Sequence, residues 1–260
     1  EACLVGSEMC IRDSINFAIE TLCENGYSLT TPPFLMNREA YEGVVDLTDF
    51  EEVMYKIEDH DLYLIATSEH PITARFKNEI IELKDGPLKF AGISTNFRRE
   101  VGAHGISDRG IWRVHQFSKV EQVIICKPED SKEMHNEILE NATLIFKKLE
   151  IPFRVIDICT GDIGTVAARK FDIEAWMPSS KKWKEVVSAS NCKSYQSVRL
   201  NMRYRTQEGT DFPHTLNSTA VATTRALAAI IENNQTDNGD VIIPEVLRKW
   251  MGNQEIIEAK

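Results

Sequence analysis

The residue types best suited to chemistry lie at the end of a strand-like stretch that leads into a long polar loop. Arg98 and Glu100 close this stretch, and the loop at residues 101–110 carries three glycines. Because alternate residues of a strand share a face, Arg98 and Glu100 are expected to point one way and Arg99 the other. A guanidinium beside a carboxylate suits a phosphate-bearing ligand that also carries an amine or a hydroxyl. An exposed hairpin with surface ion pairs would produce the same pattern.

A second group combines two hydroxyls and a carboxylate. Thr67, Ser68 and Glu69 directly follow the strand-like residues 62–66. At the end of a strand, such a set would bind a small polar amine. The alternative interpretation is a helix cap, in which Thr67 or Ser68 precedes a helix through residues 72–83.

A third candidate is a carboxylate within an apolar strand-like stretch, residues 183–189. A strand carboxylate near a phosphate site is a natural ligand for Mg²⁺, which prefers oxygen and usually bridges phosphates. Strict alternation would place Glu185 on the face opposite to Val186 and Ser188. A surface glutamate on an open sheet face remains the alternative.

The last candidate is the small and hydroxyl-rich segment 214–219, followed by an expected helix at residues 220–234 that carries Arg225. The free N–H groups at the start of such a helix favour anions, and small residues would let a ligand approach. Small residues at a helix start also occur for packing alone. The arginine within an otherwise apolar helix favours a binding role.

The elements that must position these residues indicate an α+β fold. Asp13 or Ser14 can cap a helix that runs to Glu24, and residues 131–150 are predicted to form an amphipathic covering helix. About seven strands are joined by short turns or helices without βαβα alternation, which predicts an antiparallel sheet flanked by helices. The strand-like stretches are residues 62–66, 93–100, 111–126, 153–159, 171–177, 183–189 and 198–204.

Composition limits the function further. The chain has 260 residues and a net charge of −10, which is unfavourable for a nucleic-acid binder without a local basic surface. Six cysteines contain no CxxC pair, which argues against structural zinc and for reduced thiols in the cytoplasm. No apolar run approaches membrane-spanning length. We assign residues 15–260 to one catalytic domain and leave residues 1–14 without a function.

The motifs together resemble the seryl-tRNA synthetases, a family of class II aminoacyl-tRNA synthetases. FRRE at 97–100, the loop, and GIWRVHQFSKVE at 110–121 look like motif 2 of that family. TSE at 67–69 is similar to its serine-binding element, and HTLNSTAVATTRALAAIIEN, which begins at 214, is similar to motif 3. The helix, short strand and prolines of residues 15–34 resemble motif 1, the dimerisation element. The stretch YKIEDHDLYLIATSEHP at 55–71 is closer to the archaeal and eukaryotic branch.

This resemblance implies a two-step reaction. Serine and ATP form seryl-adenylate and pyrophosphate, and the seryl group then moves to the 3′ end of tRNA(Ser), and of tRNA(Sec) as well. The implied serine-binding residues are Thr67, Ser68, Glu69, Glu121, Asn217 and Thr219. The implied ATP-binding residues are Arg98, Arg99, Glu100, Val114, Phe117, Glu185, Val186, Val187, Ser188 and Arg225.

The resemblance also assigns individual roles, with Arg98, Glu100 and Arg225 as the catalytic set. Glu121 would take the serine ammonium group, and Thr219 would contact its hydroxyl. Arg98 would contact the α-phosphate and Arg225 the γ-phosphate. Glu100 would contact the adenine amino edge, and Phe117 would stack on adenine with Val114 beside it. Glu185 and Ser188 would bind Mg²⁺.

A homodimer through residues 15–34, cytoplasmic location and the absence of zinc and membrane contacts complete the expectation. Seryl-tRNA synthetases carry an N-terminal coiled-coil arm that grips tRNA, and this sequence shows none, so a catalytic core from a longer protein is expected. An amino acid:carrier-protein ligase, which also lacks the arm, is one alternative. A non-catalytic paralogue is the other, although both expected arginines, Arg98 and Arg225, are present.

Overall fold

A seven-stranded sheet forms the centre of the computed structural model, which describes residues 2–100 and 110–259. The sheet confirms the predicted α+β class, and its neighbouring strands pair antiparallel except for the parallel edge pair β1–β5. Across the sheet the strands are β1 (Ser28–Thr30), β5 (Leu88–Phe97), β6 (Gln116–Cys126), β12 (His214–Ala222), β9 (Lys182–Lys193), β8 (Arg169–Met177) and β7 (Phe153–Asp157).

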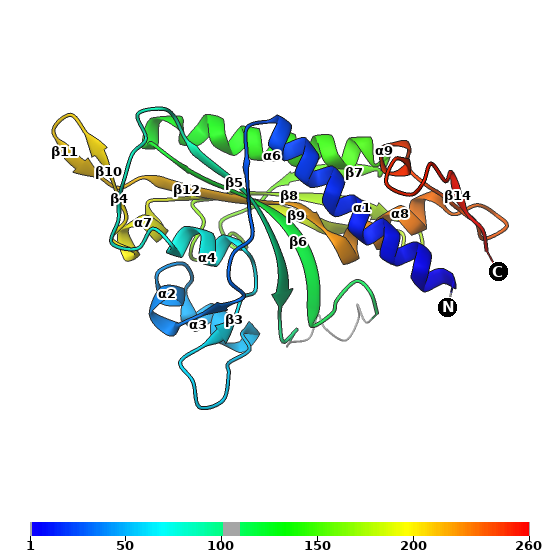
Figure 1. The fold of residues 1–260 in the computed structure, drawn as a ribbon, viewed down its shortest axis with the longest axis horizontal. Coiled ribbons are helices and arrows are strands. Elements are labelled where there is room, and N and C mark those ends of the chain that lie inside the picture. Colours follow the sequence, from blue (N-terminus) through cyan, green and yellow to red (C-terminus); the bar gives the residue numbers. More distant parts are fainter. Residues whose placement is uncertain (1, 101–109, 260) are drawn as a thin grey trace.

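Three long helices, α1 (Ala2–Glu24), α6 (Ser131–Lys148) and α8 (Thr223–Asn234), pack on this sheet (Figure 1). They bury a common core with the strand residues that face them, among them Val120, Ile124 and Ile173. Alternation along β6 then sends the residues between these, such as Glu121, to the opposite face of the sheet. The helices therefore seal one face, and the other face is left for a binding site.

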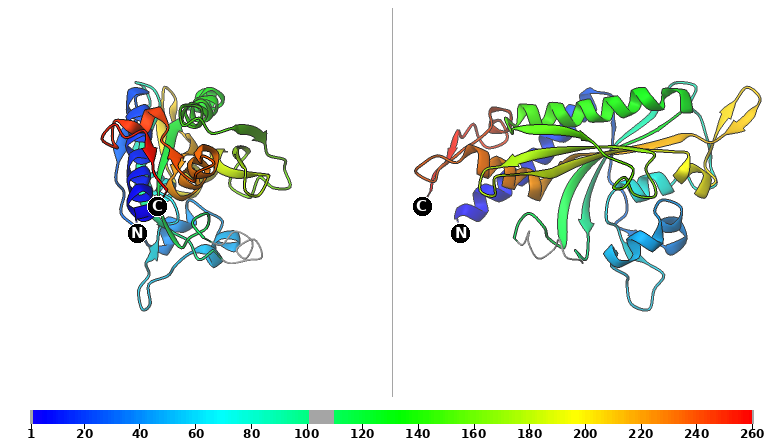
Figure 2. Two further views of the ribbon diagram at one scale, coloured as in Figure 1. Left: turned by 90° about the vertical axis from the view of Figure 1, so that its right-hand side faces the viewer. Right: turned by 180° about the vertical axis from the view of Figure 1, so that it is seen from behind.

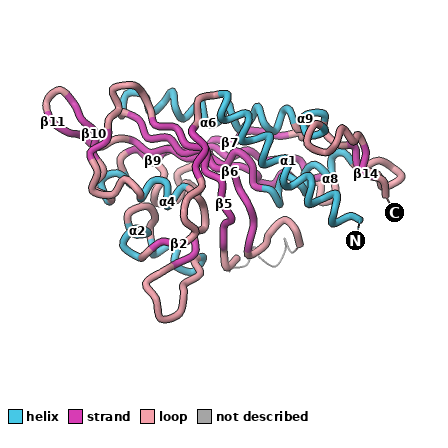
Figure 3. Tube along the Cα trace, in the orientation of Figure 1, coloured by secondary structure: helices cyan, strands magenta, loops and turns pink. Residues whose placement is uncertain are grey.

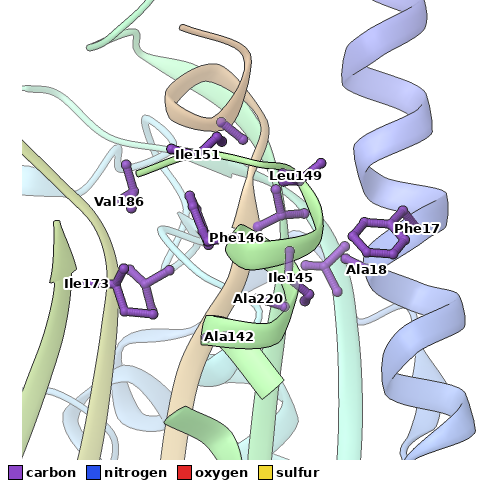
Figure 4. Close-up of a cluster of buried hydrophobic side chains, with 14 of the residues drawn as sticks. Phe17, Ala18, Ala142, Ile145, Phe146, Leu149, Ile151, Ile173, Val186 and Ala220 are labelled. Carbon is purple, nitrogen blue, oxygen red and sulfur yellow. The ribbon is translucent and has the colours of Figure 1, made fainter. Parts of the chain in front are cut away.

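The structure confirms that α6 is an amphipathic helix with one buried apolar stripe. Its stripe at i, i+4 spacing is buried, and the side chains of Ala142, Ile145 and Phe146 lie between those of α1 and those of the strands (Figure 4). The flanking apolar positions of the stripe, Met134 and Leu149, are buried as well. This helix confirms that a regular 3.6-residue period is enough to identify a covering helix.

Smaller elements surround the sheet. A three-stranded sheet of β11, β10 and β4 projects from one end of the molecule, and both ends of the described chain lie at the other end (Figures 2 and 3). No helix of residues 2–100 and 110–259 is long and apolar enough to cross a membrane. These elements are β2 (Leu35–Met36), α2 (Arg38–Glu42), α3 (Leu47–Phe50), η1 (Glu51–Val53), β3 (Tyr63–Leu64), α4 (Glu69–Ala74), β4 (Ile80–Ile81), η2 (Pro128–Asp130), α7 (Tyr195–Arg199), β10 (Arg203–Thr206), β11 (Gly209–Asp211), β13 (Val241–Ile242), α9 (Glu245–Arg248) and β14 (Ile256–Ile257).

The predicted start of the first helix is wrong. The helix already begins at Ala2, so Asp13 and Ser14 lie inside it and not at its N-terminus. The Ser14 hydroxyl donates to the carbonyl of Ile11, 2.9 Å away, which is the alternative to capping for a serine within a helix. The proposed division between residues 1–14 and the catalytic domain remains a prediction, and one continuous helix runs across it.

Residues 198–204 do not form the predicted strand. They contain the end of α7 and the start of β10. The buried side chains of Gln196 and Ser197 hydrogen-bond to distant segments, so tertiary contacts override the local preference for a strand. The expected long helix through 72–83 is also wrong, because α4 ends at Ala74 and residues 80–81 join a sheet.

Strand boundaries near the candidate site differ from the prediction as well. β5 ends at Phe97 and β6 begins at Gln116, so Arg98 to Glu100 and residues 111–115 lie outside the sheet. β12 continues to Ala222 because its pairing with β6 extends that far, whereas its pairing with β9 ends at Ser218. Asn217 and Thr219 therefore lie on a strand, and α8 begins three residues later than expected, at Thr223.

Candidate active site

A cavity of about 390 Å³ opens on the sheet face opposite the long helices. Strands β6, β9 and β12 form its floor, and the segments after β3 and β5 form its walls. Most of the residues predicted from the sequence line it together, although they are spread over nearly 160 positions of the chain (225 − 67 = 158). These residues are Thr67, Glu69, Arg98, Glu100, Val114, Phe117, Glu121, Glu185, Val186, Ser188, Asn217, Thr219 and Arg225.

A buried ion pair lies on the floor of this cavity. The Lys119 ammonium is 2.5 Å from the Glu121 carboxylate, and the two side chains are only 7% and 3% exposed. Burial lowers the pKa of Lys119, and the Glu121 carboxylate opposes that shift. Thr219, directly opposite Glu121 in the sheet, donates its hydroxyl to the same carboxylate at 3.3 Å. Lys119 was missed from the sequence, although it shares a strand face with Glu121 two residues away.

A second carboxylate, Glu69, faces the same end of the cavity from the first turn of α4. Burial and the neighbouring Glu121 carboxylate raise the pKa of Glu69 to about 7, while Lys119 and Arg98 oppose the shift. Two carboxylates and two cations thus share one desolvated region. Such an arrangement suits a ligand that brings its own ammonium group between the two carboxylates.

The position of α4 depends on a close approach to β5. Ser68 donates its hydroxyl to the Gly92 carbonyl at 3.2 Å, and a Cβ at Gly92 would lie only 2.6 Å from the Ser68 oxygen. Ser68 is fully buried against β5, so the structure does not bring it to the cavity as predicted. The Thr67 hydroxyl accepts from the Glu69 backbone N–H at 3.3 Å, so the helix-cap and binding interpretations of Thr67 are compatible.

Two arginines also line the cavity, and Arg98 is close enough to Glu69 to influence its pKa. The Arg98 side chain donates to the Ala66 carbonyl at 3.2 Å, and its guanidinium lies 5.4 Å from the centre of the Phe117 ring. Burial and then the cation of Arg225 lower the pKa of Arg98. Arg225 pairs with the Glu185 carboxylate at 3.4 Å, and two guanidinium groups lining one cavity suit a phosphate-bearing ligand.

Arg99 takes a different direction from Arg98. It is exposed, its backbone N–H donates to the Val53 carbonyl at 2.9 Å, and it does not line the cavity. The expected separation of Arg98 and Glu100 from Arg99 is observed, but strand alternation is not its cause. β5 has already ended, and Glu100 adopts a left-handed φ of 48°. Glu100 then pairs with Arg113 at 2.5 Å.

A β-bulge explains how Glu185 and Ser188 come to the same face. The pairing of β8 with β9 shifts register there, because Ile173 faces Val187 and Glu174 faces Glu185. The extra residue cancels strict alternation, so the prediction of opposite faces for Glu185 and Ser188 is wrong. Val187 points into the core and is 1% exposed, so it does not line the cavity.

Further residues of the cavity were not identified from the sequence. The loop at residues 163–167, which follows a glycine-bearing turn, forms one wall. The centre of the Trp112 ring lies 5.8 Å from the Arg225 guanidinium and 5.1 Å from the Lys184 ammonium group. The glycine-rich string ICTGDIG was the available signal for this wall. The motif 2 loop, including residues 102–105, lies outside the described residues.

The fold and this cavity place the chain in a known class. Residues 52–234 match the family of the tRNA synthetase class II core domain (G, H, P, S and T), and the chain belongs to this family. A curated serine–tRNA ligase from Methanospirillum hungatei is similar to it, with 58% identity over 244 residues, 93% of this chain and 57% of the relative.

Solved structures agree with that similarity. The seryl-tRNA synthetase from Pyrococcus horikoshii complexed with ATP has a TM-score of 0.94 and 49% identity, and the match covers 98% of this chain and 57% of that one. The cytoplasmic serine–tRNA ligase from Naegleria fowleri in complex with AMP has a TM-score of 0.92 and 42% identity, covering 98% and 61%. The resemblance noted in the sequence is confirmed, and the chain spans a little over half the length of these relatives.

The buried ion pair gives a stability prediction. Lys119→Met leaves the Glu121 carboxylate buried without its cation, which should lower the free energy of unfolding by about 3–5 kcal/mol. Arg205→Met, which removes the exposed pair of Arg205 with Glu82, is the matched control and should cost about 0–1 kcal/mol. Urea unfolding followed by circular dichroism measures both, and equal losses would contradict the structural role of the pair.

Proposed function

We propose that this chain is the catalytic domain of a serine–tRNA ligase, which activates serine with ATP and transfers it to tRNA(Ser). The observation that carries the proposal is that one cavity brings two sets of side chains together. Glu69, Glu121 and Thr219 suit the ammonium and hydroxyl of serine, and Arg98 with Arg225 suits phosphates. The relatives named serine–tRNA ligase, one 58% identical, support the choice of amino acid.

In the first step, a carboxylate oxygen of serine attacks the α-phosphorus of ATP, and pyrophosphate leaves. Charge develops on the α-phosphate oxygens, where the fixed guanidinium of Arg98 would stabilise it. Arg225 would hold the departing pyrophosphate, and Glu100 and Phe117 would hold the adenine. Because the chain supplies no nucleophile, its contribution is the placement of two substrates and the stabilisation of charge.

The residues proposed for Mg²⁺ fit a hard cation. Glu185 and Ser188 lie on one face of β9, and Ser188 hydrogen-bonds the Asp172 carboxylate directly opposite it on β8. The Glu185 carboxylate also pairs with Arg225 at 3.4 Å. One Asp172 oxygen is buried without a hydrogen-bond partner. No cluster of three or more acidic, histidine or cysteine ligands occurs among the described residues, and Mg²⁺ needs only one or two carboxylates when phosphates complete its shell. The ion would neutralise phosphate charge.

The second step and the cellular context extend the proposal. Transfer of serine to tRNA(Ser), and to tRNA(Sec), would take place at the same cavity. A chain with a net charge of −10 offers little general attraction for phosphate backbones, so tRNA binding would depend on local basic groups. We also propose a cytoplasmic location and activity without zinc.

Serine specificity tests the proposal directly. Serine-dependent exchange of pyrophosphate into ATP should exceed alanine-dependent exchange by roughly 10⁴-fold in kcat/KM, because Thr219 would lose the hydroxyl that it contacts when alanine replaces serine. Isotope exchange with each amino acid over a range of concentrations measures the ratio. Equal rates with serine and alanine would rule out the serine assignment.

The two adjacent arginines give a matched pair of variants. Arg98→Ala should lower the rate of serine-dependent exchange about 10²–10³-fold, because it removes a donor aimed at developing charge. Arg99→Ala should change the rate only a few-fold, because Arg99 is exposed and outside the cavity. Arg98→Lys should recover little activity, since an ammonium cannot replace a planar two-pronged donor.

Circular dichroism would first establish that both alanine variants fold. An inactive Arg99→Ala together with an active Arg98→Ala would show that the assignment of Arg98 to the phosphate is wrong.

A homodimer through residues 15–34 is also proposed. β1 is an edge strand, and Leu29 and Phe34 beside it are 53% and 39% exposed. Exposed apolar groups at a sheet edge favour association with a second copy. Light scattering should give twice the mass of the chain, and the double variant Leu29→Asp, Phe34→Asp should give the monomer. Leu144→Asp, at an exposed position on α6, is the control and should remain a dimer; a monomeric unmodified protein would contradict the proposal.

A further inference from the structure

Gln196 lies behind the cavity and connects three separate segments of the chain around it. It is the second residue of α7, it is 1% exposed, and it does not itself line the cavity. Its Nε2 donates to Glu69 Oε1 at 2.8 Å and to the Val44 carbonyl at 3.1 Å, and its Oε1 accepts from the Thr215 hydroxyl at 2.6 Å. One buried amide thus links α4, the segment after α2, and β12.

The neighbours of this amide fix its orientation. A flipped amide would place its oxygen against the Glu69 carboxylate and the Val44 carbonyl, which are both acceptors. It would also leave two N–H groups facing the Thr215 hydroxyl. The orientation that donates to Glu69 is therefore the only one that satisfies these partners, and it holds one Glu69 oxygen in place.

We propose that Gln196 is a positioning residue of the amino-acid subsite, which orients the Glu69 carboxylate toward the ammonium group of the bound amino acid. The inference rests on the proposed function, because it takes the ammonium group of serine to lie between the Glu69 and Glu121 carboxylates. Gln196 touches neither substrate. It acts through Glu69. Its second hydrogen bond, to the Val44 carbonyl, holds the segment after α2 in place beside the cavity.

Several charged groups around Glu69 influence its pKa together with the hydrogen bond from Gln196. Glu121 on β6 disfavours a charged Glu69, while Lys119 on β6 and Arg98 after β5 favour it, and burial disfavours it most. His70 on α4 and Cys192 on β9 contribute no charge near neutral pH, because burial lowers the pKa of His70 to about 3 and raises that of Cys192.

With all these groups present, the pKa of Glu69 is about 7, and the Gln196 hydrogen bond is one of the influences that lower it. Only the ionised carboxylate binds an ammonium group strongly, so activity should rise with pH as Glu69 loses its proton. Removal of the Gln196 donor raises the pKa of Glu69. The acid limb of the pH profile should therefore move to higher pH.

The test uses Gln196→Met, which keeps the length of the side chain and removes its hydrogen bonds. At pH 7, the KM for serine in pyrophosphate exchange should rise at least about tenfold, while the KM for ATP changes less than about twofold. The acid limb of kcat/KM for serine should move up by about one to two pH units, as expected for a lost hydrogen bond to a charged group. Gln235→Met, at an exposed glutamine, is the matched control and should change neither quantity.

Thr215→Val keeps the glutamine and removes only the hydroxyl that anchors its oxygen. It should move the KM for serine and the acid limb in the same direction by a smaller amount, and it decides the question if Gln196→Met does not fold. An unmoved acid limb, or equal increases in KM for serine and for ATP, would show that Gln196 serves packing alone.

Measurements on the unmodified protein distinguish a failure of the proposed function from a failure of the role proposed for Gln196. If it exchanges pyrophosphate equally well with serine and alanine, the proposed function fails. If it is serine-specific and Gln196→Met and Thr215→Val leave its pH profile unchanged, only the role of Gln196 is overturned.

Discussion

The cavity depends on charges that are held together away from water. Lys119 and Glu121 pair on the interior strand β6 with almost no exposure, and Glu69 and Arg98 face them from the walls. An unpaired charge there would be costly, so each group requires the others to be in place. The long helices make this possible because they seal the opposite face of the sheet and pack against β6 from that side.

The walls of the cavity are held by contacts that reach far along the chain. Ser68 fits against β5 because Gly92 has no side chain, and Gln196 connects Glu69 to Val44 and Thr215. These bonds place a carboxylate from residue 69 beside one from residue 121. Shape and charge in this part of the cavity therefore come from the same hydrogen bonds.

Regular elements were predictable because one dominant period governs them. The buried stripe of α6 repeats every three or four residues, and β8 alternates, so both were identified close to their observed bounds. Residues 198–204 were misassigned, since the buried contacts of Gln196 and Ser197 select a short helix there. The bulge in β9 could not be predicted from the sequence, because only the pairing with β8 shows the extra residue. That residue brings Glu185 and Ser188 to the same face of the sheet.

The sequence by itself indicated which residue types suit a phosphate, an ammonium group and a hydroxyl, because such types stand in a recognisable order along the chain. It also determined the class of the fold through its hydrophobic periods. Only the tertiary structure decided that Ser68 and Val187 turn away from the cavity, and that Lys119 and Gln196 support its carboxylates. The physical reason is that burial and charge pairing depend on distances between residues far apart in sequence, and local patterns do not encode those distances.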